Sequence, residues 1–263
     1  MVKEDAEMTE AVARKVVDQC LADGFNTFQL TGGEPGTYSC LSEIISYIRC
    51  KSDAQIILAT SGYNMTKQRL ENLKKCGLNA IFVSLNGYYS AVNSNSRDSA
   101  ELAKAALIAA KSAHLASYIN WVAREDNCKD FDDIFVYARA CACKGICVLK
   151  NFPNYKGEVK GTLSEKNLQK LANRILETNG YAKVETCYME MLKAMGESKD
   201  LCDARNGNCV FANVDGSYSP CSKKTYIKYQ NITELYDNNN RWMDQLCQQE
   251  VKGTDFQIDF SIC

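Results

Sequence analysis

Two hydrophobic patterns alternate along the chain. Short, nearly continuous apolar runs end at Gly, Asn or Ser, and between them apolar residues recur at the i, i+3, i+4, i+7 spacing of an amphipathic helix. The apolar runs predict strands at 25–30, 55–60, 79–85, 116–122 and 146–149. The spaced segments predict helices at 8–23, 41–48, 70–76, 102–109, 131–138 and 164–175.

This alternation predicts an α/β fold in which right-handed crossovers join parallel strands. A helix precedes the first predicted strand, with Thr9 as its expected N-cap and Gly24 as its stop, and Ser164 is the expected N-cap of the last helix. Each of the five predicted strands is followed by a helix.

The first predicted strand ends abruptly in Leu-Thr-Gly-Gly-Glu-Pro, residues 30–35. Gly32 and Gly33 allow a ligand to approach the backbone closely, and Glu34 can accept hydrogen bonds from a cationic amine. Pro35 fixes the direction in which the chain leaves. The alternative is an ordinary turn between a strand and a loop.

In its context, this loop resembles the one that follows the second barrel strand of radical S-adenosylmethionine (SAM) enzymes. The resemblance implies that Gly32, Gly33, Glu34 and Pro35 form part of the cofactor site, with the Gly-Gly-Glu triplet at the amino group of the methionyl moiety. It also implies a partial (β/α)6 TIM-like barrel that lacks its first strand.

Ligands of such barrels gather at the carboxyl ends of the strands. The polar candidates there are Thr60, Ser61, Ser84, Asn86, Asn120 and Arg124. The resemblance favours Ser61, Ser84 and Asn120, because the family places polar residues near the cofactor at the ends of the third, fourth and fifth strands. Each of these residues could instead only cap or solvate its loop.

Radical SAM enzymes hold a [4Fe-4S] cluster with a Cys-x3-Cys-x2-Cys loop, and thiolates suit iron because they are soft ligands. No such spacing occurs among the 14 cysteines of this chain. Cys141, Cys143 and Cys147 have the wrong intervals and are interpreted as packing thiols. We expect either that the chain is truncated in front of Met1 or that it is a degenerate homologue without the catalytic cluster.

A second cysteine group lies near the carboxyl end of the chain. Residues 210–214 and 217–220 flank Asp215-Gly216, a strong hairpin signal, and pairing outward from this turn predicts Cys221 opposite Val210 and beside Cys209.

Cys202-x13-Gly216-x4-Cys221 resembles the opening of the SPASM and twitch domains, which bind auxiliary iron-sulfur clusters. The resemblance implies Cys202, Cys221 and Cys247 as ligands, and the hairpin adds Cys209. The full SPASM pattern is absent, since only Cys247 and Cys263 follow. A tetrahedral zinc site is the alternative.

The charges nearly balance, with 31 basic and 32 acidic residues, so no electrostatic footprint for nucleic acid or a membrane surface is present. A single histidine, His114, argues against hydrolases and zinc proteases. Without a long apolar run or a basic-then-apolar leader, the chain is expected to be a cytoplasmic protein.

The main hypothesis is a radical SAM enzyme, with a barrel at 1–180 and a small cysteine-rich hairpin module at 181–263. By resemblance, it would cleave SAM reductively to a 5'-deoxyadenosyl radical that abstracts a substrate hydrogen, most often to modify a peptide or protein. Flavodoxin or ferredoxin would supply electrons, and [4Fe-4S] clusters would be the inorganic cofactors. The alternatives are a catalytically silent barrel that serves as a binding subunit and a zinc-stapled interaction protein.

Overall fold

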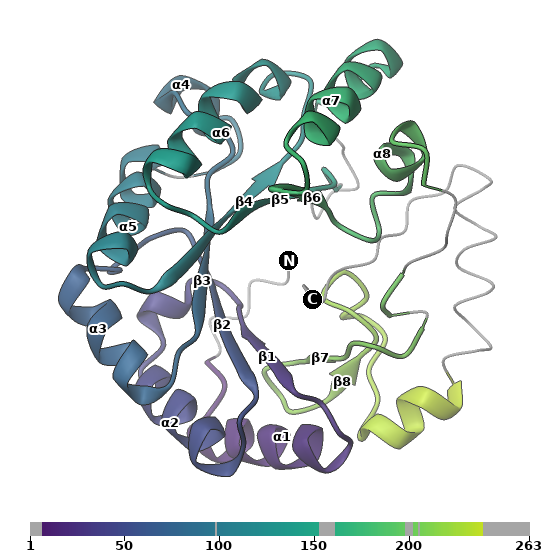
Figure 1. The fold of residues 1–263 in the computed structure, drawn as a ribbon. Helices are drawn as coiled ribbons and strands as arrows, with labels where there is room; N and C mark the ends of the chain where they lie inside the picture. The colour runs from purple at the N-terminus through teal and green to yellow at the C-terminus, as the bar shows by residue number, and fades with distance from the viewer. Residues whose placement is uncertain (1–6, 98, 153–160, 198–201, 205, 239–263) are drawn as a thin grey trace.

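A six-stranded parallel sheet, with its strands in chain order, forms the centre of the molecule. The computed structural model describes residues 7–97, 99–152, 161–197, 202–204 and 206–238. The sheet curves around a central space and helices cover its outer face (Figure 1). Its strands are β1 (Thr27–Leu30), β2 (Gln55–Thr60), β3 (Ala80–Ser84), β4 (Ala116–Val122), β5 (Gly145–Leu149) and β6 (Ala182–Val184). The predicted α/β class and partial barrel are confirmed.

The helices alternate with the strands as the apolar spacing predicts. They are α1 (Glu10–Ala22), α2 (Leu41–Lys51), α3 (Lys67–Cys76), α4 (Ser90–Asn93), α5 (Ala100–Ser112), α6 (Phe131–Ala140), α7 (Glu165–Glu177) and α8 (Met189–Ala194), with short 3-10 turns η1 (Pro35–Thr37) and η2 (Cys128–Asp130). The Thr9 and Ser164 side chains accept hydrogen bonds from Val12 N and Asn167 N, so both predicted N-caps are confirmed.

The sixth strand was not expected. The apolar pattern predicts five strands, and Ala182–Val184 adds a sixth that pairs in parallel with β5. Three residues are too few to show a strand pattern, and only the pairing with β5 identifies them.

The two faces of the sheet have different partners. Ile56, Leu58, Ile81, Val83, Ile119, Trp121, Ile146 and Val148 belong to the large core under the helices. The alternate residues face the concave side, where Ile57, Ala80 and Phe82 pack with Tyr118 and Cys147. The Phe82 and Tyr118 rings stack with centroids 4.4 Å apart and an angle of 4° between their planes. This stacked aromatic pair lines the concave side.

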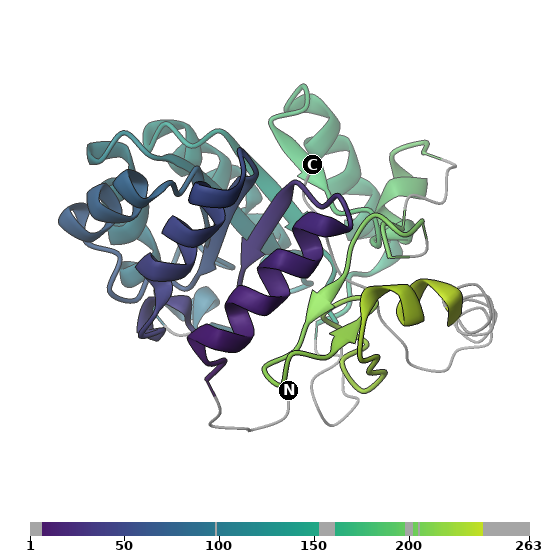
Figure 2. The same cartoon turned by 90° about the horizontal axis from the view of Figure 1, so that it is seen from below.

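The carboxyl-terminal hairpin lies against the start of the barrel. Its strands β7 (Phe211–Ala212) and β8 (Tyr218–Ser219) are antiparallel. Tyr218, Ile232 and Leu235 bury their side chains together with Cys20 of α1, and Phe25 and Phe28 pack against this group. Figure 2 shows β7 and β8 beside α1.

The register of the hairpin differs from the prediction by one residue. Phe211 pairs with Ser219 and Ala212 with Tyr218. Continued outward, this register sets Cys209 opposite Cys221, whereas the prediction set Val210 there. The predicted pairing was therefore wrong, although the turn was placed correctly.

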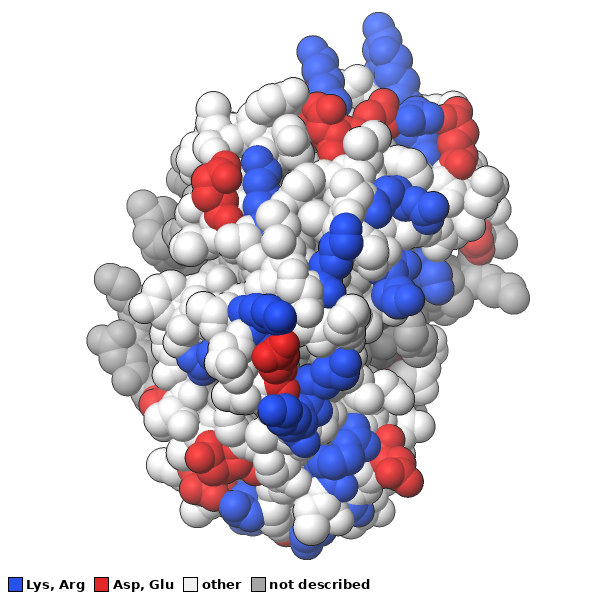
Figure 3. All heavy atoms as spheres, turned by 60° about the vertical axis from the view of Figure 1, so that its left-hand side comes forward, with Lys and Arg blue, Asp and Glu red and all other residues white. Residues whose placement is uncertain are grey.

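Basic side chains gather in a band across the helical face that Figure 3 shows. The last turns of α2, α3, α5 and α6 contain Arg49, Lys51, Lys74, Lys75, Lys111 and Arg139. Cations at helix carboxyl ends offset the helix dipole, and these ends lie at the opposite edge of the sheet from the carboxyl ends of the strands. Within the described part of the chain, no helix is both long and apolar enough to cross a membrane.

Candidate cofactor site

The Gly-Gly loop follows β1 directly and leaves its backbone accessible. Gly32 has φ +151°, in the region that favours glycine, and a Cβ built on Gly32 or Gly33 would meet no atom within 4 Å. Gly36, in contrast, is buried so tightly that a Cβ there would lie 2.4 Å from the carbonyl oxygen of Tyr63. The loop is thus anchored at Pro35 and Gly36 and open at Gly32 and Gly33.

The Glu34 carboxylate ties this loop to the end of β2. Its Oε1 accepts from Thr60 Oγ1 at 2.6 Å and from Gly36 N at 2.9 Å. Its Oε2 accepts from the backbone N of Ser61 at 2.7 Å and from Ser61 Oγ at 2.5 Å. Four donors fill the usual acceptor sites of a carboxylate. An amine at this loop would therefore meet main-chain carbonyl oxygens rather than the Glu34 side chain.

The polar residues at the strand ends fall into one row of the sheet. Ser84 pairs with Asn120 across β3 and β4. One residue beyond the last β2–β3 pair, the same parallel register sets Ser61 beside Ser84. Ser84 and Asn120 alternate with the helix-facing Val83, Ile119 and Trp121 and therefore lie on the concave side.

Asn120 has the most informative environment of this row. Its side chain is 8% exposed, and its Oδ1 atom is buried without a hydrogen-bond partner among the described residues. A buried carbonyl oxygen without a donor costs about 1 to 3 kcal/mol. A ligand that brings a hydroxyl or amine donor to the concave side would remove this cost.

Two other predicted candidates, Asn86 and Arg124, serve the scaffold. Asn86 Oδ1 accepts from Val122 N at 3.0 Å, and its Nδ2 donates to Ser96 Oγ. The guanidinium of Arg124 is paired with the carboxylate of Asp126 and lowers the pKa of that acid by hydrogen bonding. Both side chains hold the loops after β3 and β4 in place.

The cysteines of the carboxyl-terminal segment gather near the end of β6. Cys202, Cys209 and Cys221 are buried in one cluster, and the half-buried Cys187 packs against it. Cys209 Sγ lies 3.6 Å from Pro220 O. As the side chains stand in the described residues, no group of three or more His, Cys, Asp or Glu is arranged to hold a metal ion. Cys247 and Cys263 lie outside the described residues.

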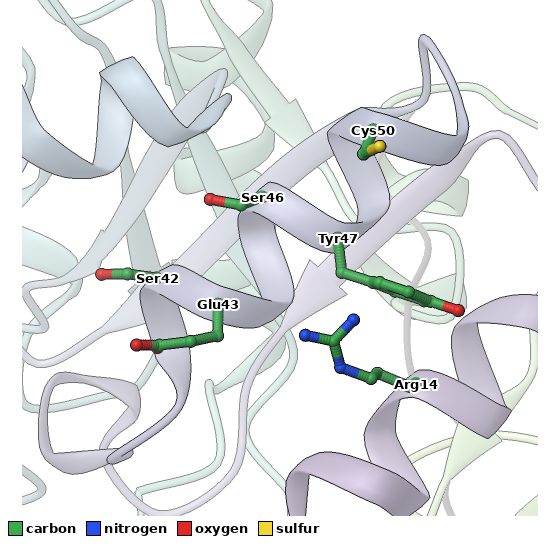
Figure 4. A pocket seen from close by; sticks show the side chains of 6 residues that line it. All are labelled: Arg14, Ser42, Glu43, Ser46, Tyr47 and Cys50. Carbon is green, nitrogen blue, oxygen red and sulfur yellow. The ribbon is translucent and has the colours of Figure 1, made fainter.

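The groove in Figure 4 lies away from these residues, on the outer surface between α1 and α2. It has a volume of about 450 Å³ and is lined by Arg14, Ser42, Glu43, Ser46, Tyr47 and Cys50. The Arg14 guanidinium lies 4.3 Å from the centre of the Tyr47 ring, a cation–π contact that packs the two helices together. No residue of the strand-end row lines this groove.

The comparison with protein families decides the identity of the fold. The Radical SAM superfamily profile matches residues 2–138. This chain belongs to the radical SAM superfamily. Superfamily members are enzymes that use SAM and a [4Fe-4S] cluster.

Among curated proteins, the AdoMet-dependent heme synthase of Methanosarcina barkeri (strain Fusaro / DSM 804) is 21% identical over 275 residues, which cover 94% of this chain and 78% of the relative. Streptococcus suis SuiB bound to SAM has a TM-score of 0.69 at 15% identity and covers 84% of this chain. Native anSMEcpe with bound AdoMet has a TM-score of 0.66 at 19% identity, covering 91% of this chain and 74% of anSMEcpe. The chain spans about 55% of SuiB. At these identities the solved structures show a shared fold.

Some residues of interest had no signal in the sequence. Cys147 packs against Ile57, Ala80 and Phe82, in agreement with its interpretation as a packing thiol, and the pairing of β4 with β5 also sets it next to Asn120 on the concave side. Lys183 has no signal in the sequence, because only the pairing of β6 with β5 gives its side chain a direction. Thr60 was a candidate ligand, and its hydroxyl instead holds Glu34.

Proposed function

We propose that this chain forms the SAM-binding part of a radical SAM enzyme that modifies a peptide or protein. The observation that carries the proposal is the buried, unpartnered Oδ1 of Asn120. It shares a row with Ser61, which holds the Glu34 side chain of the Gly-Gly loop. The row therefore offers backbone acceptors at β1 and a side-chain acceptor at β4.

The residues present suit SAM, which carries an ammonium, a carboxylate, two ribose hydroxyls and an adenine amine. The carbonyl oxygens of Gly32 and Gly33 would accept from the ammonium, because the loop is open there. Asn120 Oδ1 would accept from a ribose hydroxyl or an amine, and Ser84 adds a hydroxyl next to it. When SAM is bound and reduced in enzymes of this family, it supplies a 5'-deoxyadenosyl radical that removes a hydrogen atom from the substrate.

A peptide substrate is supported by what related structures contain. SuiB has been solved with its precursor peptide SuiA, with a TM-score of 0.69, and anSMEcpe with a Kp18Cys peptide, with a TM-score of 0.65. In this proposal, flavodoxin or ferredoxin supplies the electrons.

Heme synthesis is the second candidate function. This alternative is supported by the AdoMet-dependent heme synthase, because its match covers nearly the whole chain. Tight binding of an iron porphyrin, seen as a shift of its Soret absorption, would favour this candidate over the peptide.

An auxiliary [4Fe-4S] cluster at Cys202, Cys209, Cys221 and Cys247 is also part of the proposal. The clustering of the first three buried thiols supports it, since thiolates are the usual ligands of such clusters. Their side chains would have to turn to converge on one metal centre. In anaerobically reconstituted protein, Cys221→Ala should lose one cluster's worth of iron and labile sulfide, whereas Cys50→Ala, which changes an exposed thiol on α2, should lose none. Zinc in place of iron would support a zinc site instead.

The SAM site is tested by Asn120→Leu, which removes the unpartnered oxygen at similar volume. We expect SAM affinity in calorimetric titration to fall by about 1 to 2 kcal/mol, roughly five- to thirtyfold. The free energy of unfolding without SAM should stay equal or rise, because a buried unpartnered acceptor is lost. Unchanged SAM affinity would remove Asn120 from the site.

A further inference from the structure

The row of concave-side residues continues past Asn120 to the last two strands. Asn120 pairs with Cys147 on β5, and Cys147 pairs with Lys183 on β6. On β6, Ala182 and Val184 pack into the core under the helices, so Lys183 points to the concave side. The β5–β6 half of the row therefore presents a thiol and an ammonium.

The ammonium of Lys183 is exposed and forms no ion pair with any described residue. The neighbouring Lys150 is different, because its Nζ lies 2.9 Å from Glu190 Oε1. The charged groups that face Cys147 are Lys183 and Glu185. The buried Glu185 carboxylate already accepts from the backbone N of Lys150.

The thiol of Cys147 is a neutral group in this setting. Burial is the main cause that raises its pKa to about 12, Glu185 raises it further, and Lys183 lowers it. At neutral pH the sulfur therefore adds no negative charge that would satisfy the Lys183 ammonium.

We propose that Lys183 binds a carboxylate group of the substrate on the β6 side of the concave face, with Cys147 lining the path between this group and the cofactor. This inference rests on the proposed function, because it assigns the β1–β4 half of the row to SAM and the remaining half to the substrate. Neighbouring strands lie about 4.8 Å apart, so Lys183 is roughly 10 Å from Asn120 along the row. The substrate would thus carry its carboxylate a few bonds away from the reacting carbon.

Alkylation of Cys147 tests the charge selectivity of this half of the row without cluster, SAM or turnover. Iodoacetate carries a carboxylate, whereas iodoacetamide has nearly the same size and no charge. The ratio of the two alkylation rates at Cys147, read by peptide mass spectrometry, is compared between the parent and Lys183→Gln. A change in the thiol pKa affects both reagents equally and cancels in this ratio.

We expect the iodoacetate-to-iodoacetamide ratio at Cys147 to fall about fivefold or more in Lys183→Gln, since one unit charge about 4 Å away has this effect even in water. Lys183→Arg should retain the parent ratio, and the ratio at the exposed Cys50 should not change. An equal ratio at Cys147 in the parent and Lys183→Gln would overturn the proposal. Because this result needs no SAM, it stands apart from a failure of the SAM site.

The source of the carboxylate is identified by protection of Cys147 against iodoacetamide. Protection by the N-acetylated and C-amidated peptide Ala-Ala-Glu-Ala-Ala, whose only carboxylate is the Glu side chain, but not by glutarate at the same concentration would assign the group to a peptide side chain. Protection by glutarate as well would assign it to a small organic acid. Equal protection by the identically capped Ala-Ala-Gln-Ala-Ala, which has no carboxylate, would contradict carboxylate recognition.

Discussion

Glu34 shapes the candidate site through its hydrogen bonds to the neighbouring loop and strand end. Its carboxylate collects Thr60, Ser61 and Gly36 and so fixes the loop after β1 to the end of β2. Two of these donors are backbone N–H groups, which cannot rotate away to find another partner. The position of Gly32 and Gly33 therefore depends on the hydrogen bonds of the Glu34 carboxylate.

Glu34→Gln tests this arrangement, because an amide has one acceptor oxygen and turns an NH2 group toward a donor. We expect the free energy of unfolding, measured in urea, to fall by about 1 to 3 kcal/mol, the cost of partly buried groups left unsatisfied. SAM affinity should fall as well, because the loop loses its anchor. Unchanged stability would mean that the four hydrogen bonds contribute nothing.

Several residues of the proposed site are candidates from the sequence alone, but their contacts are not. The glycines, Ser61, Ser84 and Asn120 follow from strand ends and from the resemblance of the loop. One of the Glu34 acceptor sites is filled by Thr60, which lies 26 residues further along the chain. No local sequence pattern encodes such a contact. Lys183 could not be found, because an isolated lysine has no pattern until the pairing of β6 gives it a direction.

The hairpin shows at the scale of one element why register is harder to predict than a turn. An Asp-Gly pair predicts a two-residue turn, but Asn213 N donates to Ser217 O and closes a loop of three residues, 214–216. Gly216 at φ +83° supplies the left-handed residue that such loops need. The extra loop residue shifts the pairing by one, and Cys209 rather than Val210 comes to lie opposite Cys221.

Asp215 gives this hairpin a pH dependence. Hydrogen bonds from Lys228 and then from Ser217 lower the pKa of Asp215 to about 2. Since its unfolded pKa is about 3.9, the stabilisation is complete above that pH and is lost as the pH falls towards 2. The carboxylate is largely exposed, so we expect less than about 1 kcal/mol.

Asp215→Asn should remove this dependence. Urea unfolding at pH 6 and pH 2.5 should show that the free energy of unfolding falls more in the parent than in the variant. In 1 M salt this difference between the two proteins should become smaller, because salt screens the Lys228 contact. An equal loss in both proteins would exclude this ion pair as a source of acid sensitivity.

At the scale of the whole molecule, the carboxyl-terminal segment and the barrel share a core. Ile232 is fully buried beside Tyr218 and Cys20 of α1, so residues on both sides of the predicted boundary at 180 pack together. The division of the chain into units at 1–180 and 181–263 stays a prediction, and this shared core predicts that the two parts unfold together.

Ile232→Ala tests this coupling. We expect a loss of about 2 to 5 kcal/mol in the free energy of unfolding, with the barrel and the hairpin melting in one transition. Hydrogen exchange of peptides from the barrel and from the hairpin, read by mass spectrometry across the urea transition, should report the same midpoint. Two separate transitions in the parent protein would show that the segment folds independently.

In the proposed site SAM lies against the open backbone of the Gly-Gly loop, and Gly33→Ala would place a methyl group at this contact. A Cβ at Gly33 meets nothing in the protein, so the free energy of unfolding should stay within about 1 kcal/mol of the parent. Gly36→Ala serves as the contrast, because its Cβ would collide with Tyr63 O and destabilise the fold. We expect Gly33→Ala to lower SAM affinity in calorimetric titration about tenfold or more at unchanged stability. Parent-like SAM affinity in Gly33→Ala would contradict the proposed site.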